Sequence, residues 1–553
     1  MSDDVLNWNT KIWTPWVQPA CPMLLCLTLT PSFEPLRELV GSPLFTSIIL
    51  FKDTLATWTF RNVEAEALGM RMLDILRVPS HRSSFDEGVE ASIATLDNEI
   101  ARLLNEDVSH QSLEDLLSNF HRLEDAYSSF YRYGAFVEPV QAAAQSRLIS
   151  TVKRLKEQRE EKVDVVTESL YCLDSQSYVI DHLNQLLDVL ELTRDRLSTS
   201  RLGNGVLEMP LLPVNAFLSS LGRADDSSSD LLDSYVASHS WIKNDYLLCR
   251  RLTVAEFLEE DLTHFGGTLA DATEALALQL KEIERNRSEQ WKRKTEMLES
   301  LTPSETRVLA IHDAIGGRLS DLRKKIVKRT NGCFFALLGQ IAERIQVDLG
   351  SVLQLLPQEL DTAVRAPERF RSRLIDRADS MLVYQADFSI LDEESYDWPT
   401  GFTPMDGPSL AEGAIAVEET LAAISTRLDC LDDEGDVIEK LSGVVVYSAP
   451  GVAESSGLVK VVRNPRGADL DDGSILVASS TTPEFLPLMR KASAIVTDWG
   501  GQTSHAAIIA RELRIPCVIG TKTGSYVLKT GDEVTIDWNS GDIIRQKRIG
   551  SAT

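Results

Sequence analysis

The pattern of apolar and polar residues divides this chain into stretches with different periodicities. Residues 62–350 repeat apolar positions with the 3.6-residue period of helices that bury one face. The two clearest stripes consist of Leu113, Leu116, Leu117 and Phe120, and of Leu183, Leu186, Leu187 and Leu190. Ahead of them, FTSIILFKDTLATWTF is rich in β-branched and aromatic residues and predicts buried, extended chain. We therefore expect a large, mainly α-helical body over residues 1–395. Within it, the charged segment LKEIERNRSEQWKRKTEMLESL predicts a helix face exposed to solvent.

The composition of the sequence changes near residue 395. The stretch SYDWPTGFTPMDGPSLAEG contains three prolines and three glycines, which indicates a linker, expected over residues 396–436 with a short helix at 411–430. Beyond it the apolar period becomes two, in the segments GVVVYSAPG, GLVKVVR, SILVASS, SAIVTDW, PCVIG and EVTIDW. These short predicted strands and one helix at 504–514 predict a small α/β domain over residues 437–553.

Charge and cysteine content exclude several classes of protein. The chain has 56 Lys and Arg against 83 Asp and Glu, a net charge of −27, which argues against binding nucleic acid or an anionic membrane. The apolar run PMLLCLTLTP is too short to cross a bilayer, and we expect no secretion signal in the first twenty residues. The seven cysteines are scattered without a Cys-x-x-Cys pair, so we expect neither a metal site nor disulfides, and a cytoplasmic location.

One segment near the C-terminus, VTDWGGQTSHAAIIAREL, carries the candidate chemistry. A predicted strand ends at Gly500-Gly501, Thr503 and Ser504 can cap a helix, and His505 stands in its first turn. A helix N-terminus favours negative charge, so an imidazole there is suited to carry a phosphoryl group. From spacing alone, a capping or core histidine is the favoured interpretation, because single histidines in loops are common. The other seven histidines show no ligand-like spacing, and structural roles are expected for them: His81, His110, His121, His182, His239, His264 and His312.

The stretch 440–545 resembles the swivelling phosphohistidine domain of phosphoenolpyruvate-utilising enzymes. The resemblance runs in order through SAPGVAESSGLVKVV, then the segment from DDGSILVASS to IPCVIG, then LKTGDEVTIDWNSGDII. It implies that His505 is phosphorylated and that the domain swings between two active centres. The catalytic residues expected from the motif are His505, Thr503, Ser504, Gly500, Gly501 and Arg511, without a metal.

The helical body resembles, less extensively, the substrate domain of rifampicin phosphotransferase. The segment IAERIQVDLGSVLQLLPQEL and the opening NWNTKIWTPWVQPACP carry this similarity. It implies that Arg323 and Lys328, in DLRKKIVKR, face the phosphohistidine, although the lysine is one residue out of register. The competing interpretation is a solvated helix face with alternating charge. Trp499, inside the histidine loop, is expected to meet the acceptor when the domain docks.

The phosphoryl source is expected to be a separate protein. These enzymes use an ATP-grasp domain, for which the chain has no expected room, and a GxxxxGK[ST] loop is absent from the sequence. The resemblance to phenylphosphate synthase, which divides these tasks among subunits, implies a dikinase-type phosphotransferase subunit. It would bind no cofactor tightly, take the phosphoryl group from an ATP-grasp protein that holds ATP and Mg²⁺, and deliver it to a small hydroxylated acceptor. Two alternatives are a non-catalytic phosphocarrier that regulates a protein partner, and an acceptor of phosphoryl groups from phosphoenolpyruvate.

Overall fold

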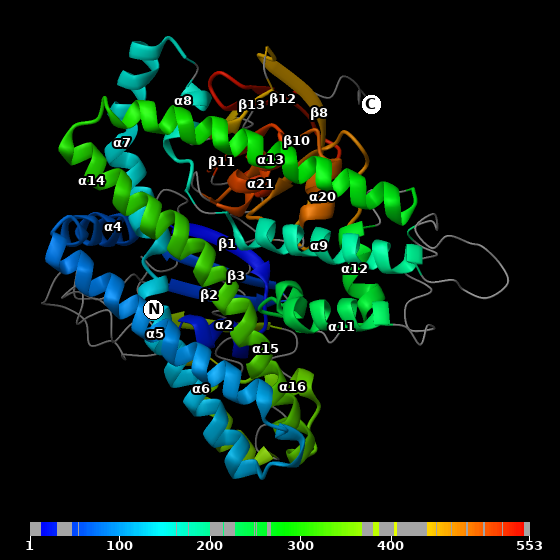
Figure 1. The fold of residues 1–553 in the computed structure, drawn as a ribbon. Coiled ribbons are helices and arrows are strands. Elements are labelled where there is room, and N and C mark those ends of the chain that lie inside the picture. Colours follow the sequence, from blue (N-terminus) through cyan, green and yellow to red (C-terminus); the bar gives the residue numbers. More distant parts are fainter. Residues whose placement is uncertain are drawn as a thin grey trace, which may run out of the picture.

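A computed structural model gives the fold of this chain (Figure 1). The residues that the structure describes are 13–29, 47–52, 55–161, 163–174, 176–199, 214, 227–247, 249, 252–262, 267–367, 380–385, 403–405, 440–449, 451–465, 467–482, 485–500, 504–521 and 524–546. The helix expected at 411–430 lies outside these residues. No described helix is long and apolar enough to cross a membrane.

A five-stranded antiparallel sheet forms part of the body. Its strands are β1 (Trp13–Pro19), β2 (Ser47–Lys52), β3 (Leu55–Arg61), β4 (Ser380–Gln385) and β5 (Thr403–Met405), in the order β1-β3-β2-β4-β5. The extended chain expected at 45–60 is confirmed as the hairpin of β2 and β3. The short apolar run is a buried helix, α2 (Pro22–Leu29). Strand β5 falls inside the predicted linker and pairs with β4, which joins that part of the linker to the body.

Helices make up most of the body, as the periodicity predicts. They are α4 (Asn62–Leu76), α5 (Pro79–Asn105), α6 (Leu113–Gly134), α7 (Val137–Arg159), α8 (Val163–Leu170), α9 (Tyr178–Thr199), α11 (Ser227–His239), α12 (Val254–Leu262), α13 (Leu269–Leu298), α14 (Pro303–Ile311), α15 (Ser320–Ile345), α16 (Leu349–Leu353) and α17 (Leu360–Arg365). Short 3₁₀ segments are η2 (Val108–His110), η4 (Ser240–Lys243) and η7 (Pro357–Glu359). A π-helix, η6 (His312–Leu319), joins α14 to α15.

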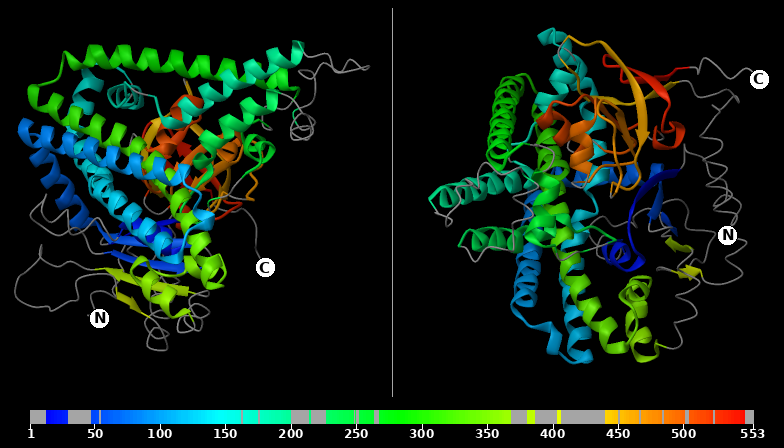
Figure 2. Two further views of the ribbon diagram at one scale, coloured as in Figure 1. Left: turned by 60° about the horizontal axis from the view of Figure 1, so that its bottom comes forward. Right: turned by 90° about the vertical axis from the view of Figure 1, so that its right-hand side faces the viewer.

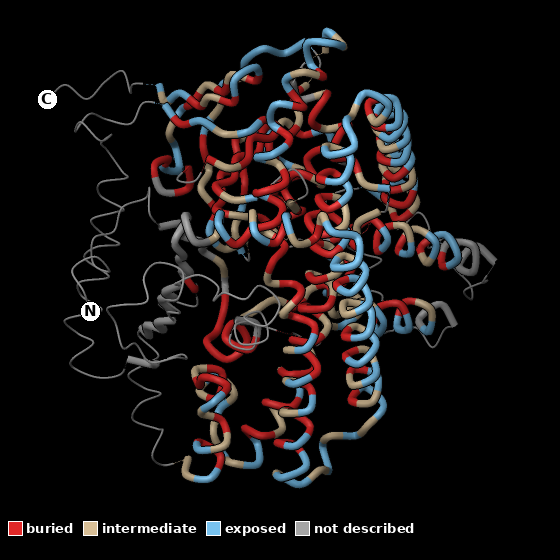
Figure 3. The backbone as a smooth tube through the Cα atoms, turned by 90° about the vertical axis from the view of Figure 1, so that its left-hand side faces the viewer, coloured by how far each residue is buried: buried red, intermediate tan, exposed pale blue. Residues whose placement is uncertain are grey.

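The predicted apolar stripes face the core. In α6 the buried positions include Leu116, Leu117 and Phe120, and in α9 they include Leu186 and Leu190. Figure 3 shows the result along the outer helices, where buried and exposed residues alternate turn by turn. Helix packing therefore follows from the sequence pattern in this part of the chain.

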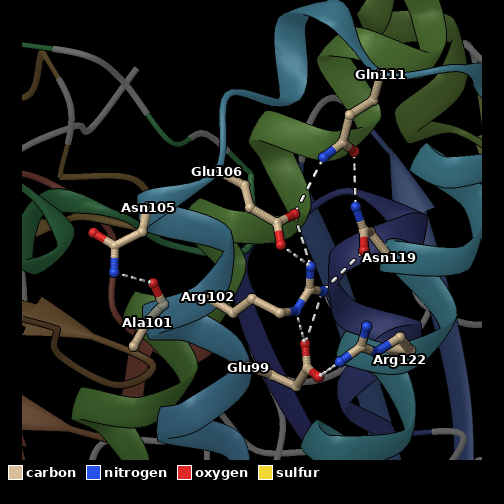
Figure 4. Close-up of polar contacts among 8 residues, drawn as sticks. All are labelled: Glu99, Ala101, Arg102, Asn105, Glu106, Gln111, Asn119 and Arg122. Carbon is tan, nitrogen blue, oxygen red and sulfur yellow. Dashed lines mark hydrogen bonds and ion pairs between the residues drawn. The ribbon is translucent and has the colours of Figure 1, made fainter.

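A polar cluster fastens the end of α5 to α6 (Figure 4). The Arg102 guanidinium donates to the Glu106 carboxylate at 2.8 Å and to Asn119 Oδ1 at 2.8 Å. Asn119 Nδ2 donates to Gln111 Oε1 at 2.7 Å, and Gln111 Nε2 returns to Glu106 at 3.1 Å. Glu99 adds a second carboxylate to Arg102. The ring orders the turn between the two helices, because each member holds the next in place.

Helix α13 departs from its expected exposure. Its charged segment has exposed residues, but a buried stripe runs along it as Leu276, Leu280, Ile283, Asn286, Lys294 and Met297. Lys294 is only 2% exposed, and its Nζ donates to the Cys172 carbonyl and to Asp313 Oδ2, both at 2.6 Å. The prediction of a solvated face is therefore wrong for this stripe, because residues distant in the sequence bind its lysine.

The C-terminal domain is a mixed eight-stranded sheet with three short helices. Its strands are β6 (Lys440–Ser442), β7 (Val444–Tyr447), β8 (Glu454–Val461), β9 (Ile475–Ala478), β10 (Ala494–Thr497), β11 (Cys517–Ile519), β12 (Glu533–Asp537) and β13 (Asp542–Arg545), and its helices are α20 (Leu486–Lys491), α21 (His505–Leu513) and α22 (Gly524–Val527). The order is β6-β13-β12-β8-β9-β10-β11-β7, with β8, β9, β10 and β11 parallel. All six predicted strands and the predicted helix are confirmed.

Gly443 lies between the two ends of this sheet. It alone separates β6, at one end of the strand order, from β7, at the other. A Cβ on Gly443 would lie 2.5 Å from Val518 Cγ1 and 2.7 Å from the Ile519 carbonyl oxygen. Its N–H donates to the Gly541 carbonyl at 2.9 Å. Glycine is needed here because the backbone of β11 approaches too closely for a side chain.

The C-terminal domain packs against the helical body through α20 and α21 (Figure 2, right). One apolar core includes residues of α9, α11, α12 and α13 together with residues of β9, α20 and α21. Helix α13 packs directly on α21, and α8 packs on β7. The candidate histidine helix is therefore held against the body in this arrangement.

Candidate functional site

The histidine loop has the backbone that the sequence predicts. Ser504 has extended dihedrals and caps α21, and its Oγ accepts a hydrogen bond from the Ala507 N–H at 3.3 Å. Gly500 has φ +129°, which side chains rarely adopt, and a Cβ there would lie 2.6 Å from Ser504 Oγ. Gly501 and Thr503, the other two predicted loop residues, lie outside the described residues.

His505 is the first residue of α21 and is 6% exposed. Its Nδ1 lies 3.0 Å from the hydroxyl of Thr481, which comes from the segment between β9 and α20. This bond fixes the orientation of the ring, and the first turn of the helix adds the positive end of its dipole. A buried, oriented imidazole at this position is suited to form a covalent bond to an anionic group. Thr481 was missed by the sequence reasoning, although it follows a predicted strand in SILVASSTTP.

Asp498 anchors the base of the loop. It ends the strand segment ahead of Trp499 and is fully buried. One carboxylate oxygen accepts from the Ser525 N–H at 2.9 Å and the Thr521 hydroxyl at 3.0 Å, and the other contacts the Ser525 hydroxyl. Burial raises the pKa of Asp498 to about 6, although these hydrogen bonds oppose the shift. The Asp498 carboxyl group therefore connects the loop to α22, and its pKa of about 6 lies near neutral pH.

Replacing Asp498 with asparagine should flatten the pH dependence of stability. A carboxyl whose folded pKa is raised from 3.8 to about 6 stabilises the fold below pH 4 and loses that contribution as the pH rises through 6. The wild type should therefore lose about 2 kcal/mol relative to Asp498→Asn between pH 4 and pH 7. Urea unfolding of both proteins at pH 4, 5, 6 and 7 measures the difference. Asp471→Asn, an exposed carboxylate on the same domain, is the control. Parallel curves for wild type and Asp498→Asn would contradict the prediction.

Trp499 is held by its backbone at the root of the loop. Its N–H donates to the Ser479 carbonyl at 2.9 Å, and its carbonyl accepts from the Thr497 hydroxyl at 3.0 Å. The side chain is half-buried, and its Nε1 is buried without a hydrogen-bond partner among the described residues. A buried indole N–H normally has a partner, so this group is a candidate donor to a bound molecule.

Arg511 lies on the part of α21 that meets the body. It is 7% exposed and interacts electrostatically with Tyr171, Cys172 and His312. His312 is fully buried in the π-helix, where its ring packs on Tyr171 at 4.4 Å between centroids. Burial lowers the pKa of His312 although Asp313 opposes the shift, which keeps a second cation away from Arg511. Arg511 therefore lies close enough to the body to influence the electrostatics of Tyr171, Cys172 and His312.

Arg323 and Lys328 are buried in α15, at 8% and 7% exposure. Arg323 Nη1 donates to the Gly134 carbonyl at 2.9 Å and to Glu138 at 2.8 Å. Lys328 Nζ donates to the carbonyls of Ile242 at 3.1 Å and Asn244 at 2.6 Å. A solvated helix face is therefore excluded for these two side chains. Their contacts join α15 to other parts of the body, and the predicted contact with the phosphohistidine stays a prediction.

Among the described residues, no group of three or more His, Cys, Asp or Glu side chains has the geometry of a metal site.

The sequence reasoning also missed the polar network of Lys294, Asp313 and His312. The one signal available was the occurrence of Asn286 and Lys294 in the apolar stripe of α13.

Comparisons with known proteins show what the C-terminal domain is similar to. Residues 470–541 match the family described as "PEP-utilising enzyme, mobile domain". A probable phosphoenolpyruvate synthase of Archaeoglobus fulgidus is 39% identical over 142 residues, which are 25% of this chain and 18% of the relative. The phosphoenolpyruvate synthase of Deinococcus radiodurans is 48% identical over 113 residues, 20% of this chain and 14% of the relative. The chain thus spans less than a fifth of these two relatives. The C-terminal domain of this chain therefore matches the mobile domain of phosphoenolpyruvate-utilising enzymes over residues 470–541.

Proposed function

We propose that this chain is a phosphotransferase subunit that carries a phosphoryl group on His505. The group would come from a separate nucleotide-binding protein holding ATP and Mg²⁺, and it would pass to the hydroxyl of a small organic acceptor bound by the helical body. The observation that carries the proposal is the ring of His505, oriented by Thr481 at the mouth of a capped helix. The relatives named phosphoenolpyruvate synthase support this class of chemistry.

The proposed reaction has two displacements at phosphorus. In the first, Nε2 of His505 attacks, an N–P bond forms and the P–O bond to the donor breaks. Nε2 is assigned because Nδ1 is occupied by the Thr481 hydroxyl. In the second, the acceptor oxygen attacks, the N–P bond breaks and the hydroxyl proton leaves to solvent or a base. The helix N-terminus would stabilise the negative charge on the phosphoryl oxygens in both steps.

The proposed cycle requires motion of the C-terminal domain about the segment that joins it to the body. His505 is 6% exposed when α21 rests on α13, and a separate protein needs access to it. Swivelling between a loading position and a delivery position would provide that access. The two domains share a continuous apolar core in the docked arrangement, which suits the step that must exclude water.

Labelling experiments test this function. The purified chain is incubated with ATP labelled at its β- or γ-phosphorus, or with labelled phosphoenolpyruvate, each with an extract of the source cells. An acid-labile, base-stable label on the peptide containing His505, found by mass spectrometry, is the expected result with ATP. Labelling only from phosphoenolpyruvate would replace the proposed donor. Absence of label from every donor would contradict the carrier role.

Trp499→Ala should shorten the life of the phosphorylated state. The half-buried indole lies in the histidine loop, where we propose that it shields the phosphohistidine from water and contacts the acceptor. Without it, hydrolysis of chemically loaded protein should accelerate roughly tenfold, the effect of about 1.4 kcal/mol in a barrier. Loading with potassium phosphoramidate and following phosphohistidine by ³¹P NMR gives both rates. Trp291→Ala, a partly exposed tryptophan of α13, is the control. An unchanged lifetime would show that Trp499 only packs within its domain.

A further inference from the structure

Three side chains connect the end of α21 to α13. Arg514, the C-cap residue of α21 with φ 55°, reaches out of the C-terminal domain. Its Nη1 lies 3.3 Å from Glu282 Oε1, and its Nη2 donates to Asn286 Oδ1. Glu282 and Asn286 are four residues apart and therefore share one face of α13. One guanidinium thus spans both acceptors across the boundary between the domains.

The buried partner in this contact is Asn286. It is 6% exposed and stands in the apolar stripe of α13, next to the buried Ile283. Its Oδ1 accepts from Arg514, whereas its Nδ2 has no hydrogen-bond partner among the described residues. An amide buried in such a stripe is costly unless it is hydrogen-bonded. Loss of Arg514 would therefore leave Asn286 Oδ1 unpaired only while the domain is docked, so the Arg514–Asn286 hydrogen bond favours the docked position.

The ion pair adds orientation more than affinity. The side chains of Arg514 and Glu282 are 41% and 49% exposed, so solvent screens their attraction. Apolar residues of α21 also contribute to this boundary, among them the buried Ala506, Ala507 and Ile509. The polar contact adds to the apolar contacts between the domains, and its loss should have a measurable effect.

We propose that Arg514, Glu282 and Asn286 form a latch that keeps the C-terminal domain docked and His505 inaccessible, so that the latch must open before the histidine is loaded. The inference rests on the proposed function in one respect, the phosphorylation of His505. His505 and Arg514 lie at opposite ends of the same helix, so release of one end frees the helix that carries the other. The latch would be an autoinhibitory contact, because a protein donor could reach the imidazole nitrogen of His505 only after the latch opens.

The test measures access to His505 with a small reagent and needs no phosphoryl donor. The full chain and its variants Arg514→Glu, Glu282→Arg and the double reversal are treated with diethylpyrocarbonate, and mass spectrometry follows the His505 peptide, with the exposed His81 as internal reference. Arg514→Glu, which also removes the hydrogen bond to the buried Asn286, should accelerate modification of His505 about tenfold. Glu282→Arg affects only the exposed ion pair and should have a smaller effect in the same direction. The double reversal should return the rate toward wild type, since the charges are again opposite.

Lys491→Glu is the matched control. Lys491 pairs with Asp469 at 3.0 Å within the C-terminal domain, so its reversal changes the charge as much without touching the latch. It should leave the His505 rate unchanged. Rates within about twofold of wild type in both single reversals, with normal circular dichroism, would overturn the latch. Failure of the labelling experiment with an intact latch effect would instead reject the carrier role, so the two hypotheses fail separately.

Discussion

Replacing His505 with alanine should abolish phosphoryl transfer by this chain while leaving the fold intact. The imidazole is the proposed nucleophile, and removing a covalent nucleophile typically lowers turnover by about 10⁴-fold or more. Alanine suits the first turn of a helix, and Ser504 still caps it. The lost hydrogen bond to Thr481 should lower stability by only about 1 kcal/mol. Retention of the labelled adduct, measured by mass spectrometry, against unchanged urea unfolding separates the two effects.

Two further variants sharpen this prediction. Thr481→Val removes the hydroxyl at 3.0 Å from Nδ1 but keeps the ring, and it should slow labelling about tenfold through a less well oriented imidazole. His110→Ala removes a histidine whose side chain is 89% exposed and should change nothing. Full labelling of the His505→Ala protein would place the phosphoryl group on another residue and reject the site.

Asp313→Ala should be among the most destabilising substitutions in the helical body. It leaves the ammonium group of Lys294, 2% exposed, without its carboxylate partner at 2.6 Å. An uncompensated buried charge costs about 3–5 kcal/mol. The chain has a matched comparison in the same π-helix, because the Arg318–Asp174 pair is 48% and 53% exposed. Arg318→Ala should cost less than about 1 kcal/mol.

A double variant tests the cause of that loss. Lys294→Met together with Asp313→Ala removes both charges and keeps most of the apolar volume of the lysine. It should recover a large part of the stability that Asp313→Ala loses, as measured by the urea midpoint. If the double variant is less stable than Asp313→Ala alone, the carbonyl contact of Lys294 with Cys172 matters more than its charge.

The C-terminal domain could be predicted closely because its signals are local. Alternating apolar residues bounded by Gly, Pro and Asp mark each strand, and the glycine at position 500, the cap at Ser504 and the helix after His505 are all set within a few residues. Local patterns of this kind depend on backbone geometry alone. The orientation of His505 was less accessible, because its partner Thr481 comes from a segment 24 residues earlier.

The helical body shows the limit of such reasoning. Its helices follow from their period, but the partners of its buried charges do not. Arg323 meets Glu138 across 185 residues, and Lys294 meets the Cys172 carbonyl across 122. Strand β4 joins the hairpin of β2 and β3 from more than 300 residues away. Periodicity states that a face is buried and leaves open what it is buried against, so the solvated face expected for α13 was wrong at Asn286 and Lys294.

The single residue between β6 and β7 has a mechanical consequence. Lys440–Ser442 pairs with β13, Val444–Tyr447 pairs with β11, and only Gly443 separates these two ladders. One continuous stretch of backbone, at the start of the domain, therefore connects the two end strands of the sheet. We expect a force applied to the chain before Lys440 to be shared between the hydrogen bonds of β6 with β13 and those of β7 with β11. The domain should therefore move as a rigid body, and torque applied at Lys440 should turn the whole sheet before it peels away a strand.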